Sequence, residues 1–337
     1  MSGKKNGRER QNLPGIAGIG AAVPEHVLTN AELEKLVETS DEWIVSRTGI
    51  RERRILEECE DPTKLGVEAA RQAIKAAGIT PQELDFVITA TNLGTMPIPG
   101  SSPFIIQELG VGKDIPFFDL LAGCTGFVYS LKVASDLLNS GDYKNILIIG
   151  LEALSRFTDW TDRSTCVLFG DAAGAAVISR MPEGRGVISS CLSGDSSQWD
   201  VLFMDGGGTK FPASEKTINN KMHYLKMTGG GVFKSAVRMM EDTTERALAS
   251  AGLGKEEVDW VIPHQANMRI LKAFAERCGI PMEKVITNLD RYGNTSTASI
   301  PLALTEAVAD GRVKKGDLLV LNAFGAGVTY GAVVLRW

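Results

Sequence analysis

The apolar residues of the chain alternate between short and long segments. Short runs of aliphatic and β-branched residues predict buried strands at 84–90, 146–150, 175–179, 260–262 and 318–321. The longer segments between them have apolar residues at helical spacing, and they predict helices at 68–77, 127–139, 232–251 and 301–309. Because strands and helices alternate, we expect an α/β protein whose central sheets are covered by helices.

The chain also contains an internal repeat. The segment from Ala76 to Ile88 recurs from Ser250 to Ile262, 174 positions later. A second match pairs residues 118–150 with residues 289–321 and aligns Cys124 with Asn294. The repeat predicts two related halves around a pseudo-twofold axis, so that two equivalent helix starts meet at one site.

Three segments follow from this pattern. We expect a disordered tail at 1–14, a first half with the nucleophilic cysteine at 15–185, and a second half with the histidine and the asparagine at 186–337. No apolar stretch follows the basic residues of the tail, and no apolar run has the length that a bilayer requires, so we expect neither a signal peptide nor a membrane partner. With 337 residues, of which 44% are hydrophobic, the chain can bury a substantial core.

Charge and cysteine content narrow the functional classes. The net charge of −5 argues against nucleic acid as a partner, although a local basic patch could serve an acidic protein. The five cysteines are odd in number and form no C-x-x-C pair, which argues against a disulfide framework and a zinc ribbon. We therefore expect a reducing compartment, the cytoplasm, and no metal.

Cys124 is the cysteine with a setting suited to chemistry. A cysteine is ordinarily a small buried hydrophobe. Cys124, however, lies between Gly123 and Thr125-Gly126, at an expected turn from a strand into a helix. The start of a helix carries unpaired N–H groups and partial positive charge, which stabilise a thiolate and bind an oxyanion.

A candidate base is found by elimination among three histidines. His26 and His223 lie in polar segments and are expected to face solvent. His264 follows the apolar run 260–263, at the carboxyl end of a predicted strand, where α/β proteins place ligands and catalytic groups. A hydrogen-bonded structural histidine is the alternative.

A functional role for Asn294 is indicated only by the internal repeat. An asparagine followed by Thr295 and Ser296 is also an ordinary turn or helix cap. Its alignment with Cys124 is what indicates a role at the same site.

Three glycine-rich segments, 15–20, 170–175 and 324–331, resemble phosphate-binding loops only superficially. None continues into the Lys-Ser/Thr of a P-loop, and none has the strand, helix and acidic residue of a dinucleotide site. Close packing of backbones explains them better, as does an exposed N–H group near Ala326 that could bind an oxyanion.

Several of these segments together resemble one family. Cys124 with its glycine neighbours, residues 263–267, 293–296 and 170–175, and the long motif at 39–53 are similar to β-ketoacyl-acyl-carrier-protein synthase III, from about residue 15 to the C-terminus. The resemblance implies a homodimeric thiolase-like fold, with two duplicated halves in a five-layered αβαβα arrangement. It also implies the first condensation of type II fatty acid synthesis: an acyl-CoA starter and malonyl-acyl-carrier-protein give a 3-oxoacyl-acyl-carrier-protein, CoA and carbon dioxide, without a cofactor.

The resemblance also assigns roles to residues. Cys124 is the acylated nucleophile, His264 and Asn294 are its catalytic partners, and the backbone N–H groups of Cys124 and Ala326 form the oxyanion hole, although the family often has glycine at the position of Ala326. Trp43 and Arg163 resemble the pair that sandwiches the adenine of CoA. The remaining CoA or pantetheine contacts are Arg47, Lys234, Asn267 and Arg269, of which Arg269 is also a candidate for docking the carrier protein. The acyl pocket is assigned to Ile98, near a gating position supplied by the other subunit, and to Leu154, Leu168, Phe169, Met227 and Phe324.

Three other functions compete with this one. A starter-using condensing enzyme of secondary metabolism, of polyketide or alkylquinolone type, or a hydroxymethylglutaryl-CoA synthase would share the fold. A papain-like thiol hydrolase would also use Cys, His and Asn, but the sequence that surrounds the nucleophile in that family is missing here. An acyl-CoA-binding protein without activity has little support while all three catalytic positions are present.

Overall fold

The computed structural model describes residues 12–228 and 232–337. Residues 1–11 of the expected tail lie outside the described residues, whereas Pro14 is already the first residue of strand β1. Every strand and helix expected from the sequence is present, with ends that differ by up to five residues. The sequence pattern missed the strands β1 (Pro14–Ala22), β5 (Phe117–Leu120), β8 (Gly186–Gly194) and β13 (Thr329–Arg336), as well as four strands of two or three residues.

The first half contains a five-stranded sheet in the order β1-β7-β6-β4-β5. The strands β6, β4 and β5 run parallel to one another, while β7 is antiparallel to both of its neighbours. Their bounds are β1 Pro14–Ala22, β4 Phe86–Ala90, β5 Phe117–Leu120, β6 Asn145–Glu152 and β7 Ala172–Arg180.

The second half repeats this topology with four strands, in the order β8-β13-β12-β11. The strands β11 and β12 are parallel, and β13 is antiparallel to β12 and β8. A single parallel bridge between Val261 and Val285 lies where a counterpart of β5 would pair. The bounds are β8 Gly186–Gly194, β11 Trp260–Pro263, β12 Leu318–Gly325 and β13 Thr329–Arg336. The two sheets thus draw their strands from residues 14–180 and 186–336, while a division between two domains at residue 185 stays a prediction.

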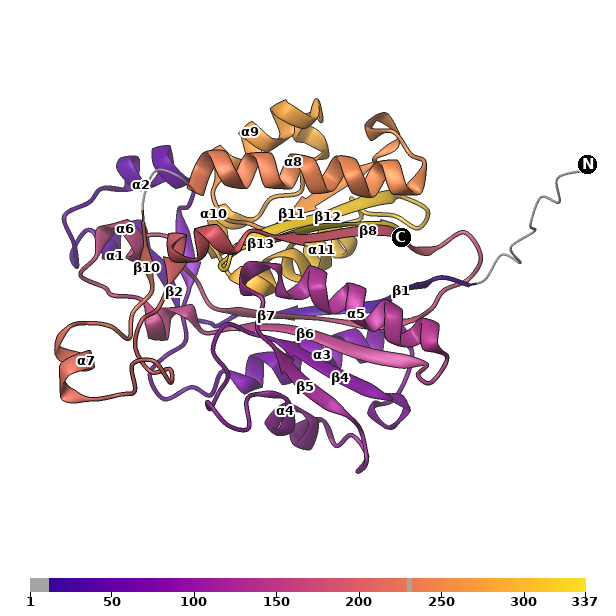
Figure 1. Ribbon diagram of the computed structural model, residues 1–337, viewed down its shortest axis with the longest axis horizontal. Helices are drawn as coiled ribbons and strands as arrows, with labels where there is room; N and C mark the ends of the chain where they lie inside the picture. Colours follow the sequence, from indigo (N-terminus) through magenta and orange to yellow (C-terminus); the bar gives the residue numbers. More distant parts are fainter. Residues whose placement is uncertain (1–11, 229–231) are drawn as a thin grey trace, which may run out of the picture.

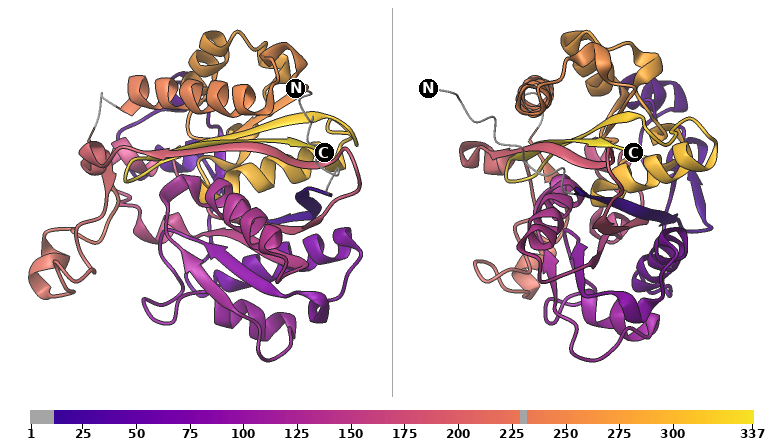
Figure 2. Two further views of the ribbon diagram at one scale, coloured as in Figure 1. Left: turned by 45° about the vertical axis from the view of Figure 1, so that its right-hand side comes forward. Right: turned by 90° about the vertical axis from the view of Figure 1, so that its right-hand side faces the viewer.

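Helices and sheets form five layers (Figure 1). Helices α3 and α4 cover the outer face of the first sheet, α5 and α11 lie between the two sheets, and α8 and α9 cover the outer face of the second. The turned views in Figure 2 show the same order of layers. The α/β class and the five-layered αβαβα arrangement are therefore confirmed. These helices span α3 Thr63–Ala77, α4 Ser102–Leu109, α5 Gly126–Ser140, α8 Val232–Ala251, α9 Met268–Cys278 and α11 Ser299–Ala309.

Smaller elements surround the layers. Two short antiparallel pairs are formed by β2 (Val27–Thr29) with β3 (Glu52–Arg54) and by β9 (Leu202–Phe203) with β10 (Lys226–Met227). The short α-helices are α1 Asn30–Leu33, α2 Asp41–Thr48, α6 Arg163–Cys166, α7 Glu215–Asn219 and α10 Leu289–Tyr292. The 3₁₀ turns are η1 Pro81–Glu83, η2 Gly123–Thr125, η3 Leu154–Phe157, η4 Ser196–Val201, η5 Lys255–Glu257, η6 Met282–Lys284 and η7 Ser296–Ala298. The segment around α7 extends away from the layered body (Figures 1 and 2).

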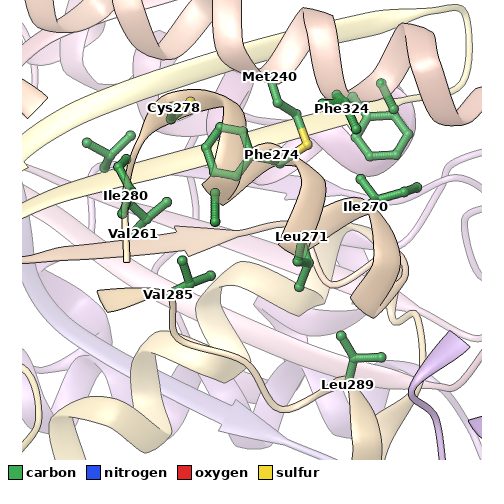
Figure 3. Packing of buried hydrophobic residues seen from close by; sticks show 14 of the residues in the cluster. Met240, Val261, Ile270, Leu271, Phe274, Cys278, Ile280, Val285, Leu289 and Phe324 are labelled. Carbon is green, nitrogen blue, oxygen red and sulfur yellow. The ribbon is translucent and has the colours of Figure 1, made fainter. Parts of the chain in front are cut away.

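An apolar core joins α8 and α9 to the second sheet (Figure 3). Met240 on α8, Phe274 on α9 and Val261 on β11 meet in it, and each is buried. Phe324 on β12 lies at the end of this cluster near Ile270. The core therefore holds the end of β12 firmly, and the loop that follows β12 belongs to the functional site described below. Among the described residues, no helix is both long and apolar enough to cross a membrane.

Candidate active site

Cys124, His264 and Asn294 line one cavity of about 480 Å³. Cys124 lies in η2, between β5 and α5. His264 follows directly after β11, and Asn294 precedes η7 and α11. The sequence therefore identified three residues that the two halves bring to one cavity, from positions as far apart as 124 and 294.

The structure corrects the alignment that linked Cys124 to Asn294. In the first half a left-handed Gly123 (φ 57°) begins η2, which leads into α5; in the second half a left-handed Ser296 (φ 47°) begins η7, which leads into α11. Superposing these turns makes Thr297 the counterpart of Cys124. Asn294 lies three residues earlier, in the segment that leads to the turn. The expectation that the two helix starts meet holds, but the asparagine is not the symmetry mate of the cysteine.

The thiol of Cys124 is buried and hydrogen-bonded. Burial raises its pKa to about 12, because a thiolate at this position would lose its hydration. The hydroxyl of Ser296 donates a hydrogen bond of 3.2 Å to Sγ and opposes this shift. The effect of the helix start that the sequence suggested is therefore outweighed by burial, and Cys124 is a neutral thiol at neutral pH.

His264 is also buried and neutral. Burial lowers its pKa to about 3, so the ring carries one proton near pH 7. Its Nδ1 lies 2.8 Å from the hydroxyl of Ser299, which lies 2.8 Å from the carbonyl oxygen of Ser296 as well. The one hydrogen of Ser299 can go either to Nδ1 or to this carbonyl oxygen. When Ser299 donates to the carbonyl, Nδ1–H donates to Ser299 and Nε2 is an acceptor. When Ser299 donates to Nδ1, the ring proton is on Nε2, and His264 can donate a hydrogen bond to a bound substrate.

The side chain of Asn294 has a fixed orientation. Its Oδ1 accepts a hydrogen bond of 2.9 Å from the backbone N–H of Ser296, so its NH₂ group is the remaining polar end. The backbone of Asn294 is held by Leu168 and Gly170, through hydrogen bonds of 2.8 and 3.1 Å. Asn294 can therefore present an amide donor to a ligand in the cavity, and it stays a donor at any pH near neutral.

Two glycines allow the backbones at Cys124 and Ala326 to approach each other. A Cβ atom at Gly123 would lie 2.7 Å from the nitrogen of Ala326, and one at Gly325 would lie 2.4 Å from the nitrogen of Cys124. Both distances are shorter than any normal carbon–nitrogen contact. This close approach brings the two expected oxyanion donors to one place, and the alanine at position 326 does not prevent it.

The expected CoA contacts fall into two groups. Trp43, Arg47, Asn267 and Arg269 line the same cavity as Cys124. The guanidinium of Arg163 lies 4.9 Å from the ring centre of Trp43, so one of the two must move for an adenine to insert, since a sandwich needs about 7 Å, or two contact distances.

Lys234 lies neither in the lining of the Cys124 cavity nor beside Trp43 and Arg163. It is exposed on α8 and lines a separate hollow together with Arg238. The roles of all these residues stay predictions.

Four of the six acyl-pocket residues lie together. Leu168, Phe169, Met227 and Phe324 line the cavity beside Cys124. Leu154 is buried in η3 and is not part of this lining, and Ile98 is 86% exposed on a loop beside β5. An apolar cavity wall is thus present without these two residues.

The sequence analysis missed the polar residues behind the thiol. Ser296 belongs to the motif at 293–296, which by itself assigns it no role, and nothing in the local sequence points to Asn92. Glu152 had a signal, because it is an acidic residue two positions after the apolar run 146–150 and is fully buried at the end of β6. A charged residue in a buried position usually has a partner or a function.

Comparison with known proteins decides the family. Residues 118–196 match the family model of 3-oxoacyl-[acyl-carrier-protein] synthase III, and residues 248–337 match the model of its C-terminal part. A β-ketoacyl-[acyl-carrier-protein] synthase III of Symbiobacterium thermophilum is 48% identical over 96% of this chain and 98% of its own length. The chain belongs to the β-ketoacyl-acyl-carrier-protein synthase III family. Its members are acyl-transferring condensing enzymes, in agreement with the sequence analysis.

Solved structures of the synthase III family confirm the thiolase-like fold. The 3-oxoacyl-[acyl-carrier-protein] synthase III of Aquifex aeolicus has a TM-score of 0.89 and 44% identity, and covers 96% of this chain and 100% of its own. A priming β-ketosynthase from the R1128 polyketide pathway is also similar, with a TM-score of 0.87 and 33% identity over 97% of both chains. The synthases of Symbiobacterium thermophilum and Aquifex aeolicus, with 48% and 44% identity, therefore match more residues of this chain than the R1128 ketosynthase does.

Proposed function

We propose that the protein catalyses the decarboxylative condensation of an acyl-CoA starter with malonyl-acyl-carrier-protein, the step that begins type II fatty acid synthesis. The observation that carries the proposal is that Cys124, His264 and Asn294 line one cavity with the residues expected to bind CoA. Full-length likeness to synthases named for this reaction supports it.

In the first half-reaction, the sulfur of Cys124 attacks the thioester carbonyl of acyl-CoA. The bond from the acyl carbon to Sγ forms, the bond to the CoA sulfur breaks, and the thiol proton of Cys124 ends on CoA. The backbone N–H groups of Cys124 and Ala326 hold the oxyanion, and the loss of one such donor typically costs about 10²–10³ in rate. Because the free thiol is neutral, its proton must leave as the carbon–sulfur bond forms.

In the second half-reaction, His264 and Asn294 bind the thioester carbonyl of the malonyl unit. Their N–H groups stabilise the negative charge on its oxygen as carbon dioxide leaves with cleavage of the carbon–carbon bond. The resulting carbanion attacks the acyl-Cys124 carbonyl, and Cys124 leaves as a thiolate that takes up one proton. Loss of carbon dioxide drives the reaction, so the proposed mechanism needs no metal or organic cofactor.

Substrate entry is assigned to the rim formed by Trp43, Arg47, Asn267 and Arg269. Trp43 and Arg163 offer flat faces for the adenine, and the exposed Arg47 and Arg269 offer positive charge to phosphates. Asn267 already caps α9 and donates to the carbonyl of Arg47, so its contribution is to hold the rim. We assign Lys234 and Arg269 together to docking of the acidic carrier protein, since both are exposed cations near the start of α8 and α9.

We further propose a cytoplasmic homodimer joined at the β5 edge of the first sheet. This edge strand exposes Phe117 and Phe118, and Leu121 just after it is 74% exposed. Exposed apolar residues on an open strand edge mark an interaction surface. Ile98 lies on the loop packed against Asp119 of β5, so in such a dimer it would reach the partner's acyl pocket rather than its own.

Labelled acyl-CoA and malonyl-acyl-carrier-protein test the proposal. Wild-type protein should acquire the label on Cys124 and pass it to a 3-oxoacyl product, and Cys124→Ala should acquire none. His264→Ala and Asn294→Ala should still be acylated but lose release of carbon dioxide from the malonyl substrate. Release of the labelled free acid would favour a thiol hydrolase, and full condensation by both variants would refute the assigned roles.

A further inference from the structure

Two side chains outside the proposed mechanism, those of Ser296 and Asn92, connect the thiol of Cys124 to the buried carboxyl group of Glu152. Ser296 donates to Sγ of Cys124 over 3.2 Å, and Asn92 donates to the hydroxyl of Ser296 over 2.8 Å. The same Nδ2 of Asn92 donates to Oε1 of Glu152 over 2.7 Å. Glu152 is 1% exposed, and Oε1 also lies 2.9 Å from the hydroxyl of Thr297.

The hydrogen bonds from Asn92 to Glu152 and to Ser296 have a defined direction. The carboxyl oxygens of Glu152 bring the NH₂ end of Asn92 toward them, which fixes the orientation of that amide. An NH₂ group can only donate, so the oxygen of Ser296 must accept from Asn92. The single hydrogen of the Ser296 hydroxyl then has two acceptors within reach, the carboxylate of Glu152 and Sγ of Cys124 at 3.2 Å. When it is donated to Sγ, it favours a negatively charged sulfur.

The backbone of Ser296 serves the same site. Its N–H group fixes the side chain of Asn294, as described above, and its left-handed φ of 47° begins the turn into α11. This conformation is uncommon for a residue other than glycine and is held by the surrounding structure. Ser296 therefore contacts the proposed nucleophile with its side chain and a second proposed catalytic residue with its backbone.

We propose that Ser296 is a further catalytic residue, whose hydroxyl stabilises the Cys124 thiolate during acylation, and that Asn92 and Glu152 are positioning residues that aim this hydroxyl. The inference rests on the proposal that Cys124 is the nucleophile. It concerns the first half-reaction, whereas His264 and Asn294 act in the second.

Glu152 also has an electrostatic effect of its own. Burial raises its pKa to about 7, and its negative charge raises the pKa of Cys124. The groups that face the carboxyl are Asn92, Ser296 and Thr297, which are uncharged, and the thiol of Cys124 is the titratable group on which its charge acts. Below pH 7 Glu152 is mostly neutral and leaves the thiolate undisturbed. Above pH 7 it is charged and opposes the thiolate.

The two residues should therefore shift the reactivity of Cys124 in opposite directions. Ser296→Ala removes the donor and should slow alkylation of Cys124 by iodoacetamide by about tenfold or more, the usual effect of one hydrogen bond to a charged group. Glu152→Gln keeps an oxygen that can accept from Asn92 but removes the charge. It should speed alkylation above pH 7 and leave it unchanged below pH 6, so the rate–pH profile changes its shape.

The experiment measures alkylation of Cys124 by mass spectrometry across the pH range, with single-turnover acylation by acetyl-CoA in parallel. Ser130→Ala is the matched control, because Ser130 is equally buried on α5 and its hydroxyl has no hydrogen-bond partner among the residues described here. It should match the wild type. Thermal unfolding of each variant checks that it is folded.

The outcomes separate this inference from the proposed function. If neither acetyl-CoA nor a longer acyl-CoA acylates Cys124 in the wild type, the proposed function fails. If one of them does, but Ser296→Ala keeps the wild-type rate and profile, the inference about Ser296 is wrong. An unchanged profile in Glu152→Gln would refute the electrostatic role of Glu152. Slow alkylation of Cys124 in Ser296→Ala, together with an altered rate–pH profile in Glu152→Gln, supports the roles of both residues.

Discussion

Cys124 and His264 show how burial sets the starting state of this site. The same loss of hydration raises the pKa of the thiol to about 12 and lowers that of the imidazole to about 3, so both are neutral over a wide range around pH 7. A papain-like hydrolase works with a thiolate of depressed pKa beside its histidine. The site in this protein has the opposite character, which favours the condensing enzyme over that rival.

The absence of a side chain at Gly325 is expected to be essential for acylation of Cys124. Gly325→Ala should lower the rate of Cys124 acylation by roughly 10²–10³, because the added methyl group would lie 2.4 Å from the nitrogen of Cys124 and push one oxyanion donor away. Burst kinetics with acyl-CoA measures this step. Gly112→Ala, at an exposed position with open space around it, is the control. A wild-type burst in Gly325→Ala would place the oxyanion hole elsewhere.

At the scale of elements, the glycine-rich strand β1 is explained by its contact with α3. A Cβ at Gly18 would lie 2.2 Å from the carbonyl oxygen of Ala73, and one at Gly20 would lie 2.5 Å from that of Ala69. The strand and the helix therefore pack backbone against backbone. The glycine-rich segments 170–175 and 324–331 make comparable close contacts, at Gly170 with Tyr292 and at Gly325 with Cys124. The packing interpretation of these segments is confirmed.

We expect Gly18→Ala to destabilise the protein by about 1–3 kcal/mol, the usual cost of forcing extra atoms into a packed core. Urea unfolding followed by circular dichroism measures the change. Gly208→Ala provides the comparison, since its added methyl group meets nothing within 4 Å and should leave the midpoint unchanged. Equal midpoints for the two variants would mean that β1 and α3 can separate without cost.

For the whole molecule, the β5 edge of the first sheet is an open edge with exposed apolar side chains. The second sheet ends at β11, which Val285 covers with a single bridge, whereas β5 exposes its outer edge with Phe117, Phe118 and Leu121 nearby. Pairing of two such edges would bury these side chains and bring Ile98 of each chain to its neighbour.

Leu121→Glu should convert the proposed dimer to a monomer, because it would place a charge in the proposed apolar interface. Light scattering after size-exclusion chromatography gives the mass directly. Leu36→Glu is matched to it, since Leu36 is 56% exposed on the loop after α1, away from β5. A Leu121→Glu protein with the mass of the wild-type dimer would exclude β5 as the interface.

The sequence by itself determined the class of fold, most buried elements and the two-fold repeat, and it predicted three residues that line one cavity. The buried elements are local features, because periodicity reports which segments are buried, and the surroundings of Cys124 and His264 report strand ends and helix starts. Asn294 was predicted from the repeat and from the family resemblance. The apolar pattern did not predict the edge strand β5, because half of its side chains are exposed. It did not predict β1 because the glycines of that strand interrupt the apolar pattern.

Only the tertiary structure decided the properties that depend on contacts between distant residues. Ser296 reaches Cys124 across 172 positions of sequence, and Asn92 reaches Ser296 across 204. The neutral thiol, the buried carboxyl of Glu152 and the equivalence of Thr297 to Cys124 all arise where the two halves pack together. Desolvation and hydrogen-bond direction are properties of that packing, which no single segment of the chain contains.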